Sequence, residues 1–212
     1  MSALDQPRTD AGRASRPGYP QIGERLRARR QERGLSLRDL ADRLGVSPSL
    51  ISQIERGLAN PSVSTLYAMV AELDVSLDEL LFNERRESES VVSVAGPIQR
   101  SNERHRIRLA SGVLWERLTT VSEPGVEFLY VIYEVGGASS PADAFQRHAG
   151  HEWGYVLSGT LEVTIGFRQY LLEPGDAVSL DSTTPHRLAN VGDVPVHAIW
   201  FVLGRDGPDA GG

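Results

Sequence analysis

The sequence contains no cysteine, which excludes both disulfide bonds and thiolate metal sites. Any metal must therefore be bound by histidine, carboxylate or amide side chains. The sequence also lacks lysine, so all 22 basic residues are arginines. No apolar run reaches the roughly 18 residues that a membrane helix needs, and the N-terminus has no apolar signal core. We therefore expect a cytoplasmic protein with no membrane partner.

The 212 residues are 40% apolar and 24% charged, which is typical of globular proteins and enough for two small domains. The net charge of -6 is unevenly distributed. Residues 21–70 hold eight arginines and five acidic residues, whereas residues 71–90 hold two and seven, and residues 91–212 hold nine and fourteen. A basic segment on an acidic chain indicates that one domain meets phosphate.

Residues 20–82 carry the signals of five short helices. A first helix is expected from about residue 22 to residue 33, and serines at N-cap positions begin four more: Ser36, Ser47, Ser62 and Ser76. Glycines end the first three helices: Gly34, Gly45 and Gly57. The spacing therefore predicts a compact all-α domain.

From residue 91 onward the pattern changes to short β-rich runs separated by turn signals. The predicted strands are Val113–Thr120, Glu127–Val135, Trp153–Ile165, Tyr170–Leu172, Ala177–Leu180 and Val196–Leu203. Many short strands at this spacing indicate a sandwich or barrel. We expect disordered tails at 1–18 and 205–212, a helical domain at 19–82, a charged linker at 83–95 and an all-β domain at 96–204.

The second and third predicted helices, with the turn between them, form a helix-turn-helix. Its apolar residues face inward, which leaves Ser49, Ser52, Gln53 and Arg56 on the outer face of the third helix. Small side chains let such a helix enter the major groove, where glutamine can bond a base edge. The alternative is a five-helix protein–protein module with a polar outer face.

Three segments of this half, Ser-x-x-Asp-Leu-Ala, Ile-Ser-x-Ile-Glu-x-Gly and Leu-Asp-x-Leu-Leu, resemble the DNA-binding domain of the xenobiotic-response-element family, which includes the phage lambda and 434 repressors. The resemblance implies base-facing positions at Pro48, Ser49, Ser52 and Gln53. It implies that phosphates are held by amides near Ser36 and Ser62, together with Arg38, Arg43 and Arg56. It also matches Arg30 and Glu55 to a structural ion pair. Some members have glutamine where this chain has Pro48 and Ser49, so base specificity is not carried over.

A second constellation consists of Gln146, His148, Glu152 and His186. Gln146 and His148 alternate on one predicted strand and should share a face. Two imidazoles and one carboxylate that converge in a barrel would form a facial triad for Fe(II), or a site for Zn, Mn or Ni. The alternative is a metal-free polar pocket whose histidines and glutamate contact a ligand directly.

The spacing of these residues resembles the two motifs of the cupin family. The first motif, His-x-His-x3-Glu-x6-Gly, becomes Gln146-x-His148-x3-Glu152-x6-Gly159 in this chain. The second, Gly-x5-Pro-x-Gly-x2-His-x3-Asn, becomes Gly175-x5-Asp181-x-Thr183-x2-His186-x3-Asn190. The resemblance implies a cupin (double-stranded β-helix or jelly-roll) barrel that keeps three of four ligand positions. Gln146 replaces the first histidine and is a weak, neutral ligand.

The order of helix-turn-helix and then cupin is similar to a class of regulators that includes the putrescine-utilisation repressor. This resemblance implies a homodimeric, non-enzymatic transcription regulator that binds double-stranded operator DNA and senses a small-molecule effector in the cupin. The alternative is an iron cupin enzyme resembling fosfomycin-forming epoxidase, which has the same domain order and an iron site of two histidines and one glutamate.

Overall fold

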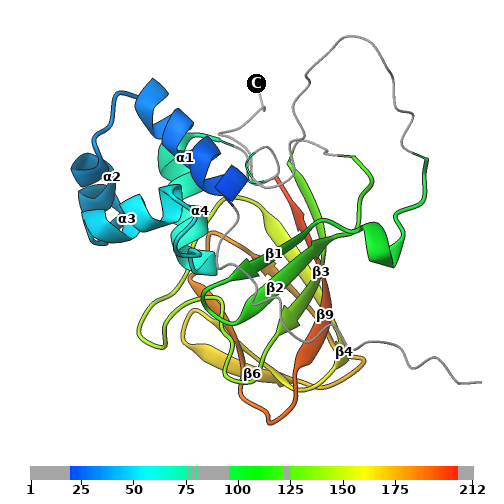
Figure 1. Ribbon diagram of the computed structural model, residues 1–212. Coiled ribbons are helices and arrows are strands. Elements are labelled where there is room, and N and C mark those ends of the chain that lie inside the picture. The colour runs from blue at the N-terminus through cyan, green and yellow to red at the C-terminus, as the bar shows by residue number, and fades with distance from the viewer. Residues whose placement is uncertain (1–19, 76, 78–79, 81–95, 122–124, 205–212) are drawn as a thin grey trace, which may run out of the picture.

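The chain folds into a helical domain followed by an all-β domain, as Figure 1 shows for a computed structural model. The structure describes residues 20–75, 77, 80, 96–121 and 125–204. The predicted tails and the predicted linker lie entirely outside these residues. The two predicted fold types are confirmed, while the exact domain boundaries stay predictions.

The helical domain contains four helices among the described residues, rather than the predicted five. Their bounds are α1 Pro20–Glu32, α2 Leu37–Leu44, α3 Pro48–Glu55 and α4 Val63–Leu73. The predicted fifth helix falls at 76–81, where residues 76, 78–79 and 81 lie outside the described set. The two described residues of that stretch, Leu77 and Leu80, are helical and buried in the domain core.

The predicted caps explain where these helices begin. The side chain of Ser36 accepts a hydrogen bond from the Asp39 amide, and the Asp39 carboxylate accepts one from the Ser36 amide. Ser47 and Ser62 accept in the same way from the third residue of α3 and α4. Such caps satisfy amides that have no partner within the helix, so local sequence sets these boundaries.

The described part of the all-β domain contains a short 3-10 helix, η1 (Ser101–Glu103), and nine strands. The strands are β1 Arg106–Leu109, β2 Val113–Arg117, β3 Val126–Tyr133, β4 His151–Ser158, β5 Leu161–Ile165, β6 Arg168–Leu172, β7 Ala177–Asp181, β8 His186–Asn190 and β9 Val196–Leu203. One sheet has the order β1-β2-β3-β9-β4-β7 and the other has the order β6-β5-β8, with antiparallel pairing throughout.

The structure differs from the predicted strands at several places. The predicted run Trp153–Ile165 divides into β4 and β5, because Gly159 takes a left-handed φ of 78° in a turn. The strands β1 and β8 are absent from the sequence prediction, because their residues include one β-branched residue, Ile107, and no Phe, Tyr or Trp. Alternating inward side chains of the two sheets form the barrel core.

The helical domain lies against one end of the barrel (Figure 1). Two backbone hydrogen bonds join the parts, from the Ala110 amide to the Pro61 carbonyl and from the Ser64 amide to the Ser139 carbonyl, each 3.0 Å long. Within the described ranges, no helix has both the length and the apolar character needed to cross a bilayer.

Candidate functional site

The first candidate site is the exposed face of α3. Pro48, Ser49 and Gln53 are exposed, and Ser52 is half-buried. The two isoleucines of α3 pack into the domain core, so the helix turns its polar side outward. Arg56 follows at the end of α3, where it is exposed and donates to the backbone carbonyl of Ser52 at 3.1 Å. All five residues therefore lie where a ligand outside the domain could reach them.

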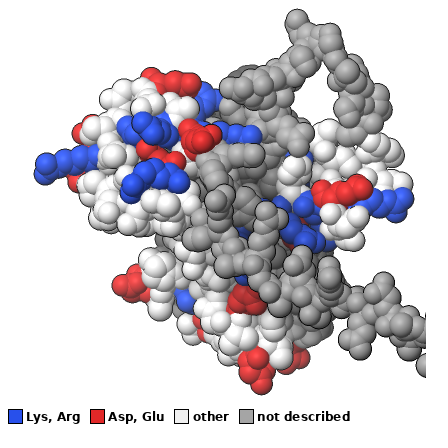
Figure 2. Space-filling model, viewed as in Figure 1, with Lys and Arg blue, Asp and Glu red and all other residues white. Residues whose placement is uncertain are grey.

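Two further arginines predicted to hold phosphate lie near carboxylates on the surface. The side chain of Arg38 is 84% exposed and its Nε is 4.0 Å from Asp42. Arg43 forms an ion pair with Glu72. Exposed pairs of this kind are weak, so both arginines could exchange these partners for phosphate. In the view of Figure 2, arginines gather on the helical domain, whereas acidic residues dominate the lower part of the barrel.

The two predicted amide sites have different surroundings. Ser36 is exposed at the start of α2, where the pKa of Asp39 is lowered because its carboxylate accepts hydrogen bonds from the side chain and backbone of Ser36. Ser62 is half-buried at the start of α4. Two residues further on, the backbone amide of Ser64 donates a hydrogen bond to the Ser139 carbonyl of the barrel. The start of α4 therefore faces the barrel in this arrangement.

The Arg30–Glu55 pair is a buried ion pair within the helical domain, as the family resemblance implies. The guanidinium donates to both carboxylate oxygens, from Nε at 2.6 Å and from Nη2 at 2.9 Å, and both residues are buried. The hydrogen bond with Glu55 raises the pKa of Arg30. This pair joins α1 to α3 and holds the exposed face of α3 in place.

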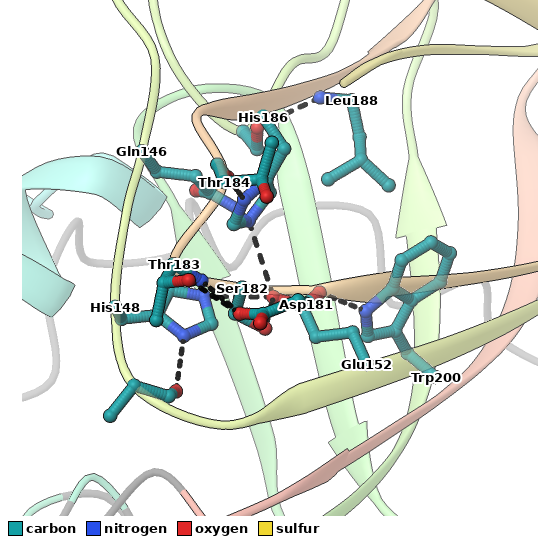
Figure 3. Close-up of polar contacts among 12 residues, drawn as sticks. Gln146, His148, Glu152, Asp181, Ser182, Thr183, Thr184, His186, Leu188 and Trp200 are labelled. Carbon is teal, nitrogen blue, oxygen red and sulfur yellow. Dashed lines mark hydrogen bonds and ion pairs between the residues drawn. The ribbon is translucent and has the colours of Figure 1, made fainter. Parts of the chain in front are cut away.

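The second candidate site lies inside the barrel, where His148, Glu152 and His186 converge (Figure 3). Glu152 is the second residue of β4, His186 is the first of β8, and His148 lies in an extended segment before β4. One ligand atom from each residue lies within 4.8 Å of the others. Oε1 of Glu152 is 2.8 Å from Nε2 of His148 and 3.2 Å from Nε2 of His186.

Hydrogen bonds at the other ring nitrogen orient both imidazoles. Nδ1 of His148 lies 2.9 Å from the carbonyl of Ala149, and Nδ1 of His186 lies 2.9 Å from the carbonyl of Thr184. A carbonyl can only accept, so each Nδ1 carries a proton, and each Nε2 is the ring nitrogen that faces the carboxylate. Two imidazole lone pairs and a carboxylate repel one another unless a cation, either a proton or a metal ion, lies between them. The residues therefore fit a divalent metal, and ligand histidines commonly donate Nδ1–H to a backbone carbonyl.

Gln146 lies beside these residues but not on a regular strand. It forms only an isolated β-bridge with His186, and His148 is not part of a strand. The prediction of one strand that carries both Gln146 and His148 is therefore wrong. The two side chains nevertheless lie at the same site (Figure 3), because the extended segment alternates its faces. Nε2 of Gln146 donates to Nε2 of His186 at 2.9 Å, and its Oε1 is buried with no hydrogen-bond partner among the described residues. That oxygen is free to meet a cation or a ligand donor.

Two side chains that the sequence did not indicate hold Glu152 in position. Nε1 of Trp200, from β9, donates to Oε2 at 2.5 Å, and Oγ of Ser182 donates to Oε1 at 3.0 Å. Gly154 makes room for the indole, since a Cβ there would lie only 2.0 Å from the Trp200 ring. The carboxylate is thus buried and accepts a hydrogen bond at each of its two oxygens.

The turn before His186 departs from the cupin motif and has its own hydrogen bonds. Oδ1 of Asp181 accepts from the amide and the hydroxyl of Thr183, and these bonds lower the pKa of Asp181. The Thr184 amide donates to the Asp181 carbonyl. This polar turn replaces the proline and glycine of the motif, so His186 still reaches the site.

Aromatic side chains surround the histidine and glutamate cluster. Tyr133 of β3 is fully buried, and burial, with a smaller effect from the charge of Glu152, raises its pKa, so its hydroxyl stays protonated. The ring of Tyr67, from α4, lies 4.9 Å from that of His148 and 5.6 Å from that of Trp115. The Tyr133 and Trp200 positions could be recognised in the sequence only as core positions of alternating strands. No sequence signal indicated Tyr67, because its role depends on how the two domains meet.

Comparison with known proteins identifies both domains. Residues 26–80 match the helix-turn-helix family, and residues 129–202 match the cupin domain family. The chain therefore contains a helix-turn-helix domain and a cupin domain. It is 29% identical to the HTH-type transcriptional regulator PuuR of Escherichia coli over 168 residues, which cover 79% of this chain and 86% of PuuR. The predicted combination of domains is thereby confirmed.

Two other relatives agree with this assignment. Over 69 residues the chain is 48% identical to the HTH-type transcriptional regulator SinR of Bacillus licheniformis, and the match covers 32% of this chain and 61% of SinR. The crystal structure of an HTH_3 family transcriptional regulator from Vibrio cholerae has a TM-score of 0.61 and 22% identity, and the match covers 87% of this chain and 96% of that one. At this identity the second likeness shows the shared fold alone.

Proposed function

We propose that this protein is a sequence-specific DNA-binding transcription regulator whose cupin domain binds a small-molecule effector and thereby modulates operator binding. The observation that carries this proposal is the exposed polar face of α3 within a capped helix-turn-helix. Two relatives that match this domain, PuuR and SinR, are HTH-type transcriptional regulators. Such a function would place the protein in the cytoplasm.

In this proposal, α3 enters the major groove with Pro48, Ser49, Ser52 and Gln53 toward the bases. Gln53 is the best base reader of the four, because an exposed amide can both donate to and accept from a base edge. The amides near Ser36 and Ser62 and the side chains of Arg38, Arg43 and Arg56 would contact phosphates. The amides at the start of α4, near Ser62, could bind a phosphate only if α4 moves away from the barrel. In the present arrangement the Ser64 amide already donates to the Ser139 carbonyl.

The cupin site would bind the effector, with or without a divalent metal. His148, Glu152 and His186 would hold the metal, with Gln146 as a further ligand, and Zn, Fe, Mn and Ni all accept such donors. A bound metal would supply a Lewis-acidic centre on which a ligand oxygen or nitrogen could bind. Without a metal, the same side chains would contact the effector directly.

A homodimer would present two α3 helices to successive major grooves, about 34 Å apart on one face of the DNA. The outer face of the six-stranded sheet offers a surface for this contact. It exposes Phe128, Trp153 and Tyr155 beside a groove of about 420 Å³. Contiguous exposed aromatic side chains on a small domain are typical of a protein–protein interface.

Selection of DNA from a random library with the purified protein tests the proposal. We expect one enriched sequence with two related half-sites. For that sequence, Gln53→Ala should lose about 1–3 kcal/mol of binding free energy with little change on random DNA. Arg38→Ala should weaken binding to both DNAs and reduce the dependence on salt concentration. Failure to enrich any sequence, or equal losses on both DNAs for Gln53→Ala, would contradict sequence-specific reading.

The alternative function is an iron cupin enzyme resembling fosfomycin-forming epoxidase, and the donor set of His148, Glu152 and His186 is the observation that favours it. The discriminating assay is turnover of a hydroxyalkylphosphonate with Fe(II) and peroxide. We expect no turnover above a His186→Ala control, alongside specific DNA binding by the same preparation.

A further inference from the structure

The DNA-binding domain contributes a wall to the cupin site. Tyr67 of α4 is only 8% exposed, although its helix belongs to the other domain. Its ring lies 4.9 Å from the ring of His148 and 5.6 Å from that of Trp115, so it covers the site from the side of the helices. An α4 segment of the helical domain is also visible at the edge of the close-up, beside His148 (Figure 3).

Backbone hydrogen bonds hold α4 in this position. The Ser64 amide lies in the first turn of α4, where it has no partner within the helix, and it donates to the Ser139 carbonyl of the barrel. Ser139 is bonded to Leu188 of β8 in turn, through its amide at 2.8 Å and its hydroxyl at 3.0 Å. Since His186 begins β8, a short chain of contacts joins the start of α4 to the site.

The donor side chains of the covered site are closed off from solvent. The side chains of Glu152 and His186 are 3% and 0% exposed. The side chain of His148 is 7% exposed, so none of the three donors is open to a molecule arriving from solvent. A metal ion needs only the space between donors that already lie within 4.8 Å of one another.

We propose that Tyr67 is part of the effector site, and that the site admits an effector molecule only when α4 moves away from the barrel. This inference rests on the proposed function. Effector binding would then be coupled to the position of the DNA-binding domain, because the occupied site and the docked helix exclude each other. A metal ion alone would bind without moving α4.

Thermodynamic reciprocity allows this coupling to be tested before the effector is known. If movement of α4 changes DNA affinity, bound DNA must change the extent of that movement by the same factor. The absence of cysteine from the chain makes thiol labelling specific to one introduced site. Tyr67→Cys places a thiol where α4 meets the barrel. Met69→Cys places a thiol on the same helix, about 200° around its axis, in the buried core of the helical domain, and serves as the control.

The two full-length variants are treated with a chromogenic aromatic disulfide, with and without the selected DNA and with Co²⁺ alone. We expect the thiol of the Tyr67→Cys variant to react at least about tenfold faster than that of the Met69→Cys variant, because α4 can leave the barrel without unfolding of its domain. The selected DNA should change the labelling rate of Tyr67→Cys by about fivefold or more in either direction and leave that of Met69→Cys unchanged. Co²⁺ should leave both rates unchanged.

Hydrogen exchange of the Ser64 amide in the unmodified protein provides a readout that no substitution disturbs. Selected DNA should change its exchange rate in the same direction as the labelling rate of Tyr67→Cys, whereas the Val70 amide, within α4, should stay unchanged. Equal labelling of the two variants, or rates that specific DNA does not alter, would overturn the inference while the proposed function stands. If no DNA is enriched, the proposed function fails separately, and the labelling contrast still decides whether α4 opens.

Discussion

Trp200→Phe tests whether the hydrogen bond from the Trp200 indole stabilises the buried carboxylate of Glu152. The substitution keeps a ring against Gly154 but removes the indole N–H that donates to Oε2 at 2.5 Å. Glu152 is almost fully buried, so no water can replace this donor. The loss of a hydrogen bond to a charged group should lower the free energy of unfolding by about 1.5–3 kcal/mol, in addition to the packing loss.

The packing loss is measured by Trp115→Phe, which removes the same atoms from a second buried tryptophan of the barrel. Urea unfolding, followed by the β-sheet circular dichroism signal, gives the free energy of unfolding of each variant. If the cupin binds Co²⁺, Trp200→Phe should also weaken that binding about 10–100-fold, because partners of a ligand carboxylate tune metal affinity. A Trp200→Phe protein that is no less stable than Trp115→Phe, with unchanged Co²⁺ affinity, would refute the role of the indole.

Four further predictions follow from the two domains. Residues 91–204 expressed alone should be β-rich by circular dichroism and dimeric by sedimentation at micromolar concentration, and a monomer would move the dimer interface elsewhere. His186→Ala should abolish stoichiometric metal binding in elemental analysis, and metal affinity of the wild type should fall at low pH because protons compete for imidazole nitrogens. The pKa of Asp39 is lowered in the folded protein, so its ionised carboxylate stabilises the fold above the ordinary pKa of 3.8. This stabilisation is lost as pH falls through the lower folded pKa. Asp39→Ala should remove this pH dependence from the free energy of unfolding. Arg30→Met should destabilise the protein by about 3–5 kcal/mol by leaving Glu55 buried and unpaired, and Glu55→Leu should restore much of this loss if the pair matters as a pair.

Local chemistry made the helical domain predictable. The capping serines and the glycine stops act through hydrogen bonds and dihedral angles within four residues of one another. The bounds of α2 and α3 and the start of α4 can therefore be derived from sequence. The apolar positions of α3 likewise determine which of its side chains stay outside. The charge imbalance between the two halves needed no structure either.

The cupin site was predictable only in part. The spacing of His148, Glu152 and His186 indicated convergence, and the structure brings their ligand atoms together. The strand predicted for Gln146 and His148 was wrong, since the segment pairs with β8 through a single bridge. The short strand β8 depends on that long-range pairing and on β5, because its own residues include no β-branched residue and no Phe, Tyr or Trp.

By itself, the sequence determined the helix boundaries, the exposed face of α3, the absence of thiolate chemistry and the set of donor side chains in the barrel. Only the tertiary structure decided that Trp200 supports Glu152 and that Tyr67 covers His148. The first contact joins residues 48 positions apart and the second joins residues of different domains, so neither leaves a periodic pattern in the chain. Such contacts arise from how whole sheets and domains pack together, and no local rule of spacing, capping or composition encodes them.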